Sequence, residues 1–250
     1  MQDSQAYKEK KAFFEKVLTL YGRNVVLEVL QDTTITIHKI HMADSNKTDA
    51  TIKKILSLAK ERELTINYHN KAALSRISKN AKQDQGVAID IIAQTYQNAT
   101  ELEQQDAYKL IALDGIHNPQ NLGMIIRSCA AGAVDGIILP KKNSAKISPL
   151  VMKASAGTLF KIPIYFCDSL ESLLPKLHGA SIYALSSYAK SSIYDLEVPK
   201  RSIFVLGNES EGVSKEVISL CNNSVSIPMR RGVESLNVAV TASLIAFMRS

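Results

Sequence analysis

Residues 109–140 read KLIALDGIHNPQNLGMIIRSCAAGAVDGIILP, and this stretch decides the fold class. Two short apolar runs, residues 109–115 and 136–140, lie on either side of a segment whose apolar residues have helical spacing. Apolar strands separated by a helix are typical of a parallel sheet that is covered on both faces. The sequence therefore predicts a strand–helix–strand unit, with the helix over about residues 121–132.

The same alternation continues toward the end of the chain. We expect further strands at residues 162–167, 181–185, 202–207 and 224–229, and helices near 147–156, 170–178, 213–221 and 238–248. The helix over 238–248 is apolar on nearly all sides, which predicts that it is buried. In a parallel α/β sheet, ligands bind at the carboxyl ends of the strands, so functional residues are sought in the loops there.

Residues 1–95 predict a separate, smaller α/β domain. We expect helices near residues 4–19, 24–31, 48–62 and 71–78, and strands at 34–40, 64–69 and 86–93. Residues 94–106, QTYQNATELEQQD, are almost without apolar side chains, which is typical of a linker. The expected organisation is a first domain over 1–95, a linker over 96–108 and a second domain over 109–250.

Composition excludes several classes of protein. The 250 residues are 46% hydrophobic and 22% charged, as in globular chains. No apolar run approaches the ~18 residues of a membrane-spanning helix, and the charged N-terminus lacks the apolar core of a secretory signal. The cysteines, at positions 129, 167 and 221, are far apart and without clustered histidines. We therefore expect no membrane association, no disulfide framework and no metal site, and a cytoplasmic location.

The net charge of +6 is unevenly distributed. Residues 1–95 hold 15 basic and 11 acidic side chains, so most of the surplus lies in the first half. A basic surplus favours an anionic partner such as nucleic acid. A surplus of this size is also ordinary for solubility, so the charge alone leaves both readings open.

Three loops at predicted strand ends carry polar residues. The first leads into the helix that holds Asn121 and, six residues later, Arg127. The second, IFVLGNESEGVS at 203–214, has two glycines at the spacing of a phosphate-binding loop, but Val-Ser follows where Lys and then Ser or Thr are required. No G-x-G-x-x-G element is present, so a dinucleotide-binding fingerprint is missing too.

The third loop, within SIPMRRGVESLN at 226–237, carries Arg230, Arg231, Ser235 and Asn237 just before the last helix. Each polar residue also has an ordinary structural explanation. Asn121 and Ser235 could cap helices, and the arginines could be solvated surface charges. Taken singly, no loop decides a function.

Taken together, the three loops resemble the signature motifs of the SpoU (TrmH) family of RNA ribose 2′-O-methyltransferases, in the SPOUT superfamily. The matching residues are Asp114, Pro119, Asn121, Gly123 and Arg127 in the first, Leu206, Gly207, Glu209 and Gly212 in the second, and Ile227, Pro228, Met229, Glu234, Ser235, Leu236 and Asn237 in the third. Residues 148–164 are similar to the family's Ser-Ala-Gly segment. The resemblance covers residues 109–250, and three motifs in order are highly specific.

The N-terminal part resembles the small ribosomal-protein-like RNA-binding domain that some members carry. YGRNVV at 21–26 looks like its opening motif, and DQGVA at 84–88 like its closing motif, with Asp84 where a His is usual. The two-domain arrangement is similar to members that methylate a guanosine ribose in large-subunit (23S) ribosomal RNA. Members that act on tRNA share the catalytic domain.

The resemblance implies S-adenosyl-L-methionine as the cofactor and RNA as the substrate, with rRNA favoured over tRNA. It also implies a deep trefoil knot in the second domain, and a homodimer in which each active site is completed across the interface. The implied site residues are catalytic Arg127, Asn121, Glu209, Ser235 and Asn237; cofactor-binding Leu206, Gly207, Asn208, Gly212, Ile227, Met229 and Leu236; and RNA-binding Arg23, Arg230 and Arg231.

Arg127 is the residue that the resemblance assigns to activating the ribose hydroxyl. Proteins hardly ever deprotonate an arginine, so a role as general base conflicts with its chemistry. We expect Arg127 to hold an RNA phosphate through its planar fork and to stabilise the developing alkoxide. The alternative readings are a tRNA guanosine methyltransferase, and a non-catalytic RNA-binding or ribosome-assembly protein on the same fold.

Overall fold

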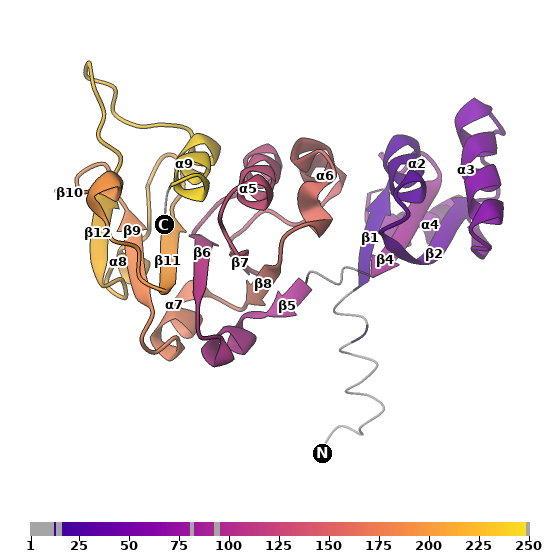
Figure 1. The fold of residues 1–250 in the computed structure, drawn as a ribbon. Coiled ribbons are helices and arrows are strands. Elements are labelled where there is room, and N and C mark those ends of the chain that lie inside the picture. The colour runs from indigo at the N-terminus through magenta and orange to yellow at the C-terminus, as the bar shows by residue number, and fades with distance from the viewer. Residues whose placement is uncertain (1–12, 14–16, 81–82, 93–95, 249–250) are drawn as a thin grey trace. The chain divides into compact units, whose positions relative to one another are not determined.

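The computed structural model describes residues 13, 17–80, 83–92 and 96–248. The chain divides into two compact units, Met1–Gln94 and Thr95–Ser250 (Figure 1). Both alternate strands with helices, and the predicted α/β class is confirmed. Among the described residues, no helix is long and apolar enough to cross a membrane.

The first unit is built on a four-stranded sheet. Its elements are β1 (Val17–Tyr21), α2 (Arg23–Gln31), β2 (Thr36–Ala43), α3 (Ala50–Glu61), β3 (Ile66–His69), α4 (Lys71–Ser78) and β4 (Val87–Ile92). The strand order is β1-β4-β2-β3, with β4 antiparallel to both neighbours and β2 parallel to β3. Asp49 and Asn70 begin α3 and α4 by accepting a hydrogen bond from a backbone N–H of the first turn.

One predicted helix of this unit is wrong at its end. Residues 17–21 form strand β1, because the alternating Leu18 and Leu20 pair along β4. The rest of the predicted helix, residues 4–16, lies outside the described residues apart from Phe13.

A chain of polar side chains crosses all four strands of this sheet. Thr19 on β1 donates a hydrogen bond of 2.6 Å to Asp90 on β4, whose other oxygen lies 3.0 Å from His41 Nε2 on β2. His41 Nδ1 in turn lies 3.0 Å from His69 Nε2 on β3. Burial alone would raise the pKa of Asp90, but hydrogen bonds from His41 and Thr19 and the charges of His41 and His38 outweigh it and hold that pKa below its usual value.

We expect this network to make the stability of the first unit depend on acid. A carboxyl group whose pKa is lowered by folding stabilises the fold above its unfolded pKa of 3.8 and ceases to do so as the pH falls through the folded value. Asp90→Asn should therefore lower the urea midpoint at pH 7, and the deficit should shrink below about pH 4. Far-UV circular dichroism of the full chain measures this. The exposed Asp44→Asn is the control, and an equal deficit for Asp90→Asn at every pH would contradict the assignment.

The second unit is a parallel sheet of eight strands. Its strands are β5 (Tyr96–Asn98), β6 (Tyr108–Leu113), β7 (Gly136–Pro140), β8 (Ile164–Cys167), β9 (Ser181–Leu185), β10 (Ser191–Ser192), β11 (Arg201–Leu206) and β12 (Asn223–Ser226). The strand order is β10-β12-β9-β11-β6-β7-β8-β5. From β6 the chain adds β7 and β8 on one side and later β9, β11 and β12 on the other. The order thus switches direction between the adjacent strands β6 and β11.

Helices cover both faces of this sheet. They are α5 (Pro119–Ala131), α6 (Pro149–Ser155), α7 (Leu170–Leu173), α8 (Lys215–Ile218) and α9 (Val238–Ala246), with short 3-10 turns η1 (Ala99–Gln104), η2 (Thr158–Phe160), η3 (Leu174–Lys176) and η4 (Ile193–Asp195). Helices α9, α5 and α6 lie in a row, with α5 packed against both others (Figure 1). Turn η1 and helices α7 and α8 share a hydrophobic core with alternate residues of the strands, such as Leu110, Ala112 and Val205.

The linker predicted for residues 96–108 is wrong. Tyr96 lies in β5, which pairs with β8, and residues 99–104 form η1. A capping box between Asn98 and Glu101 begins this turn, and Ala99 and Leu102 are fully buried in the core. Three well-placed apolar side chains are therefore enough to join an otherwise polar segment to the sheet.

Helix α9 is buried on one side only. Ala242, Ile245 and Ala246 are fully buried, as the sequence predicts, but Val240 is 47% and Phe247 63% exposed. The prediction of a helix buried all round is therefore wrong for the single chain. The trefoil knot stays a prediction.

The C-terminal end of α9 is fixed by three contacts. Ala133 N–H donates to Ala246 O at 2.7 Å, and the buried Lys109 Nζ donates to Met248 O at 3.1 Å. A side chain at Gly132 would meet Ala246 O at 2.5 Å, so only glycine allows this approach. Burial lowers the pKa of Lys109, opposed by the charges of Asp135 and Cys129. These contacts satisfy helix carbonyls that otherwise lack a partner.

Candidate functional site

The three loops come together at the carboxyl edge of the eight-stranded sheet. The first follows β6, the second follows β11, and the third follows β12 and leads into α9. Because β6 and β11 are adjacent at the point where strand order switches, their loops border the position at which such sheets bind ligands.

One side chain from each loop enters a shared cluster of hydrogen bonds. Asn121 Nδ2 and Asn237 Nδ2 each donate to the same Glu209 Oε1 at 2.7 Å. Asn237 Nδ2 also lies 3.2 Å from Asn121 Oδ1. We call Asn121, Glu209 and Asn237 the amide–carboxylate cluster. In the chain, Asn121 is 88 positions from Glu209 and 116 positions from Asn237. The cluster therefore brings together three of the five predicted catalytic residues.

Local capping explains why both asparagines can point into the cluster. Asn118, not Asn121, is the N-cap of α5 and accepts a hydrogen bond from Gln120 N–H at 2.8 Å. Asn121 is thus free to face Glu209, and only 5% of it is exposed. Asn237, not Ser235, is the N-cap of α9 through its Oδ1, so its Nδ2 remains for Glu209. The capping roles considered for Asn121 and Ser235 are therefore wrong.

The second loop is a tight turn that only glycine permits. A Cβ on Gly207 would lie 1.9 Å from the carbonyl carbon of Gly212, well inside contact distance. The turn is closed by a hydrogen bond of 2.8 Å from Gly212 N–H to Asn208 O. Gly212 has φ +73° and open space around it. At Gly207 and Gly212 the backbone of the turn is therefore not covered by a side chain of its own.

Asn208 and Asp114 fasten the second loop to the first. Asn208 Nδ2 donates to Gly115 O at 3.1 Å, and Asp114 Oδ2 accepts from Ser214 N–H at 2.8 Å. The side chain of Asn208, which is predicted to bind the cofactor, thus uses its amide to hold the two loops together. Asp114 matched the first motif but was not among the predicted site residues, because its partner lies 100 positions away.

A substitution at Gly207 should change the shape of the turn while the domain still folds. We expect Gly207→Ala to displace the turn, since the added Cβ cannot fit against Gly212, and to abolish ligand binding at this edge. The control is Gly157→Ala, which adds the same methyl group elsewhere in this unit. At position 157 a Cβ would meet nothing within 4 Å, although φ is +76°. Ligand-induced thermal shift reads the difference, and unchanged binding by Gly207→Ala would refute this role for the turn.

The third loop, residues 227–237, extends outward between β12 and α9 (Figure 1). Ile227, Met229 and Leu236, all predicted to bind cofactor, are half-buried, while Arg230 and Arg231 are exposed. Within the described residues, the backbone N–H groups of Met229 and Leu236 have no hydrogen-bond partner. Free backbone donors beside half-buried apolar side chains suit a flat, partly polar ligand.

Arg127 and Ser235 lie outside the amide–carboxylate cluster. Arg127 is on the exposed side of α5 with Met124, about 9 Å further along the helix than Asn121. Ser235 is exposed in the third loop. In the part of the chain that the structure describes, neither side chain has a hydrogen bond or an ion pair. Both are therefore available to a substrate or a partner.

Arg23 is engaged within its own unit. Its guanidinium pairs with Asp49 and donates to Asn46 Oδ1 at 2.8 Å and to Gln85 O at 3.2 Å. Its charge and three of its N–H groups thus hold the domain's loops together, and the binding of RNA by Arg23 stays a prediction. Asp84, in the neighbouring motif, is 4% exposed and accepts from Ser78 Oγ and Gly86 N–H at 2.9 and 3.0 Å.

One further contact was not foreseen from the sequence. Ser128 Oγ and Ser243 Oγ lie 2.7 Å apart and join α5 to α9 behind the cluster. Burial raises the pKa of the Cys129 thiol to about 12, which excludes it as a nucleophile at neutral pH. Among the described residues, no group of His, Cys, Asp and Glu could hold a metal ion.

Comparison with known proteins identifies the family. The model of the SpoU rRNA Methylase family matches residues 108–247, which include all three loops. The chain belongs to this family. A second model, described as RNA 2′-O ribose methyltransferase substrate binding, matches residues 19–97, which are most of the first unit and the first three residues of the second.

Similar curated proteins share both regions with this SpoU family chain. A protein of Staphylococcus saprophyticus named "Putative TrmH family tRNA/rRNA methyltransferase" is 30% identical over 237 residues, covering 92% of this chain and 94% of its own. A protein of Mycobacterium avium named as an uncharacterized tRNA/rRNA methyltransferase is 30% identical over 237 residues, covering 92% and 76%.

Solved structures share the fold. An AdoMet-bound rRNA methyltransferase from Sinorhizobium meliloti superposes with a TM-score of 0.65 at 20% identity, covering 97% of this chain and 88% of its own. The SpoU methyltransferase AviRb from Streptomyces viridochromogenes, in complex with AdoMet, gives 0.67 at 17% identity, covering 98% and 91%.

Substitutions at Asn237 should separate its two roles. Asn237→Ser keeps a side-chain oxygen for the N-cap of α9 but removes the amide donor to Glu209, whereas Asn237→Ala removes both. We expect the serine variant to keep its stability within a few tenths of a kcal/mol and the alanine variant to lose about 1 kcal/mol. Methyltransferase activity should fall in both. Chemical denaturation and activity assays check this, and full activity in the serine variant would rule out a role for the amide.

Proposed function

We propose that the protein transfers the methyl group of S-adenosyl-L-methionine to the 2′-hydroxyl of a guanosine ribose in RNA, with large-subunit (23S) rRNA as the substrate. The observation that carries this proposal is the amide–carboxylate cluster, which joins all three motif loops at the carboxyl edge of the sheet. The substrate-binding model over residues 19–97, whose description specifies 2′-O ribose methylation, supports the choice of atom.

The residues at this edge fit the proposed cofactor. The Gly207–Gly212 turn leaves room for close approach to backbone, and the free N–H groups of Met229 and Leu236 can hydrogen-bond an adenine edge. The half-buried side chains of Ile227 and Leu236 can cover the faces of the ring. When bound, the cofactor would supply an already activated methyl on a sulfonium, so no metal is required.

In the reaction, a bond forms between the ribose oxygen and the methyl carbon as the carbon–sulfur bond breaks, and the hydroxyl proton leaves to phosphate or water. The protein must hold the hydroxyl in line with the methyl group and stabilise the charge that develops on the oxygen. We assign the first task to the cluster, with Ser235 beside it. We assign the second to Arg127, whose planar fork can hold a phosphate and face the oxygen.

We further propose that the protein works as a homodimer in which Arg127 serves the site of the partner. Arg127 and Met124 are exposed on α5, and Val240 and Phe247 are exposed on the adjacent α9. A groove of about 520 Å³ lies along the same helix, lined by Ile193, Tyr194, Leu196, Ser243, Leu244, Phe247 and Met248. Apolar patches of this kind on a soluble chain are typical of subunit interfaces.

We also infer that the chain is knotted here and that it works in the cytoplasm, where the proposed rRNA substrate is found.

The substrate choice rests on the two-domain arrangement. Arg230 and Arg231 are exposed in the third loop and can contact RNA phosphates. The relatives are named for both tRNA and rRNA, so tRNA is the competing substrate.

The test is transfer of labelled methyl from S-adenosyl-L-methionine to rRNA and to tRNA, both purified from cells that lack this gene. We expect alkali-resistant 2′-O-methylguanosine in rRNA, and a loss of about 100-fold or more for both Arg127→Ala and Arg127→Lys, since lysine cannot reproduce the fork. Gel filtration of these variants confirms their fold. Label in tRNA alone would overturn the substrate, and near-normal turnover by Arg127→Lys would overturn the role of its guanidinium.

A further inference from the structure

Five lysines follow the first loop without an acidic residue between them. Residues 136–167 contain Lys141, Lys142, Lys146, Lys153 and Lys161, and no Asp or Glu. We call these five side chains the lysine face. The next 49 residues, 168–216, hold seven acidic and five basic side chains, so positive charge in this unit is concentrated on one segment. A concentration of one sign of charge creates a local potential that attracts the opposite sign.

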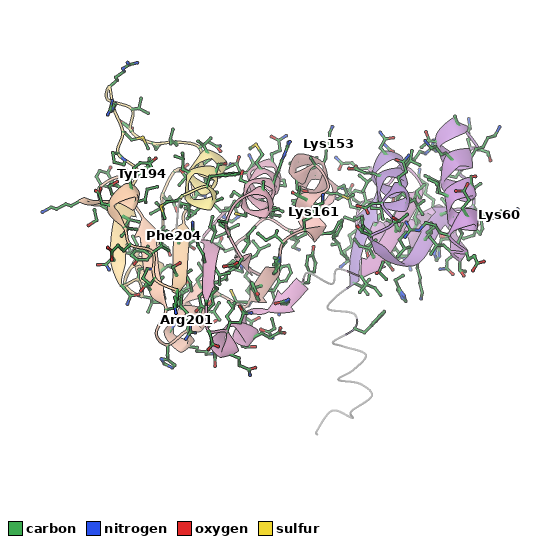
Figure 2. The ribbon with its side chains drawn as sticks, viewed as in Figure 1. Lys60, Lys153, Lys161, Tyr194, Arg201 and Phe204 are labelled. Carbon is green, nitrogen blue, oxygen red and sulfur yellow. The ribbon has the colours of Figure 1, made fainter. Side chains whose placement is uncertain are left out.

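All five lysines are exposed. Lys141, Lys142 and Lys146 lie on the loop between β7 and α6. Lys153, on α6, and Lys161, directly after η2, are labelled in Figure 2. Lys141 pairs with Asp168 at 3.6 Å, but both side chains are more than half exposed, so the pairing offsets little of its charge. Among the described residues, the other four have no ion pair or hydrogen bond from the side chain.

The lysine loop borders the candidate site. Strand β7 is the neighbour of β6, so residues 141–148 leave the same edge of the sheet as the first motif loop. Ala145 N–H donates to Ile116 O of that loop at 2.7 Å. The lysines of this loop therefore lie one strand away from the segment that leads to Asn121.

Helix α6 extends this face along α5. A Cβ on Gly123 would lie 2.5 Å from Ala154 Cβ and 2.6 Å from Val151 O, so the two helices are in close contact. Lys153 is exposed on α6, and Arg127 is exposed on α5 one turn after Gly123. Exposed positive side chains are thus found on the loop and on each of two helices that pack against each other.

The loop is held in place before any ligand binds. Lys141 N–H donates to Cys167 O at 2.8 Å, Ala145 is buried, and Asn143 takes a left-handed conformation with φ +54°. Lys142 and Lys146 therefore project from a fixed backbone. A fixed backbone reduces the ordering that binding requires.

We propose that the lysine face binds the phosphate backbone of the RNA strand next to the target nucleotide. This proposal rests on the proposed function and assigns RNA contacts beyond Arg230 and Arg231. Lysine is a compact charge on a flexible stem, which suits phosphate contacts that position RNA without reading its sequence. Exposed charge with a single, exposed acidic partner, Asp168, favours a polyanion over a protein surface, which normally offers both signs.

The experiment compares two triple variants of the full chain. The face variant carries Lys142→Gln, Lys146→Gln and Lys153→Gln. The matched control carries Lys190→Gln, Lys200→Gln and Lys215→Gln, which removes the same charge from exposed lysines elsewhere in the second unit. Neither set touches the amide–carboxylate cluster, and thermal unfolding confirms that both variants fold.

Binding to purified large-subunit rRNA is measured over a range of salt concentrations, and methyl transfer is measured alongside. In the face variant we expect the slope of log K against log salt to fall by about 2 to 3 and affinity near 0.15 M salt to fall by roughly 10-fold. KM for RNA should rise accordingly while kcat changes less than about 2-fold, because the reacting groups are intact. The control variant should match the wild type.

Equal slopes for the face variant and the control would overturn the proposal, even if the wild type methylates RNA. Binding can also be read without turnover, so a wild type that binds RNA without methylating it would refute the proposed function and still test the face. If the face variant lost binding to vesicles of anionic phospholipid while keeping its RNA binding, a membrane surface would replace RNA as the partner.

Discussion

The site depends on one carboxylate that accepts two amides. Glu209 lies on the loop after β11, and its Oε1 accepts hydrogen bonds from Asn121 on α5 and Asn237 at the start of α9. These three residues come from segments that are far apart in the chain. Hydrogen bonds to a charged acceptor are stronger than those between neutral groups. The carboxylate therefore sets the relative positions of three segments that the sheet alone does not fix.

The surrounding structure supports this junction from two directions. The Gly207–Gly212 turn, tied to the first loop through Asn208 and Asp114, fixes where the chain leaves β11. The other end of α9 is held by Ala133 and Lys109, so the helix cannot slide away from Glu209. The cofactor and substrate positions proposed above thus rest on a frame that is formed in the protein itself. The exposed Arg127 lies outside this frame, and in the proposed function it acts on RNA at the site of a partner subunit.

Sequence reasoning predicted the parts of the fold that local patterns encode. Apolar strands alternating with helices predicted the parallel sheet. The motif residues pointed to Asn121, Glu209 and Asn237, which the structure brings together, while their catalytic role stays a prediction. It missed features set by distant partners. Residues 96–104 look like a linker, but Tyr96 and Leu102 find places in the core. Arg23 forms an ion pair with Asp49 and donates a hydrogen bond to Gln85 O, and neither contact can be recognised from the sequence. Because α9 is apolar throughout, its sequence could not show that Val240 and Phe247 are exposed in the single chain.

The central claim is that the amide–carboxylate cluster acts as one unit in holding together the loops that form the proposed cofactor site. Its most direct test is a double-mutant cycle in which the affinity for S-adenosyl-L-methionine is measured by titration calorimetry for the wild type, Asn121→Ala, Glu209→Ala and the double variant. Residues that act together give a coupling energy of about 0.5–3 kcal/mol, so the double variant should bind hardly more weakly than Glu209→Ala alone. Additive losses would contradict the account, because Asn121 and Glu209 would then contribute to the site independently.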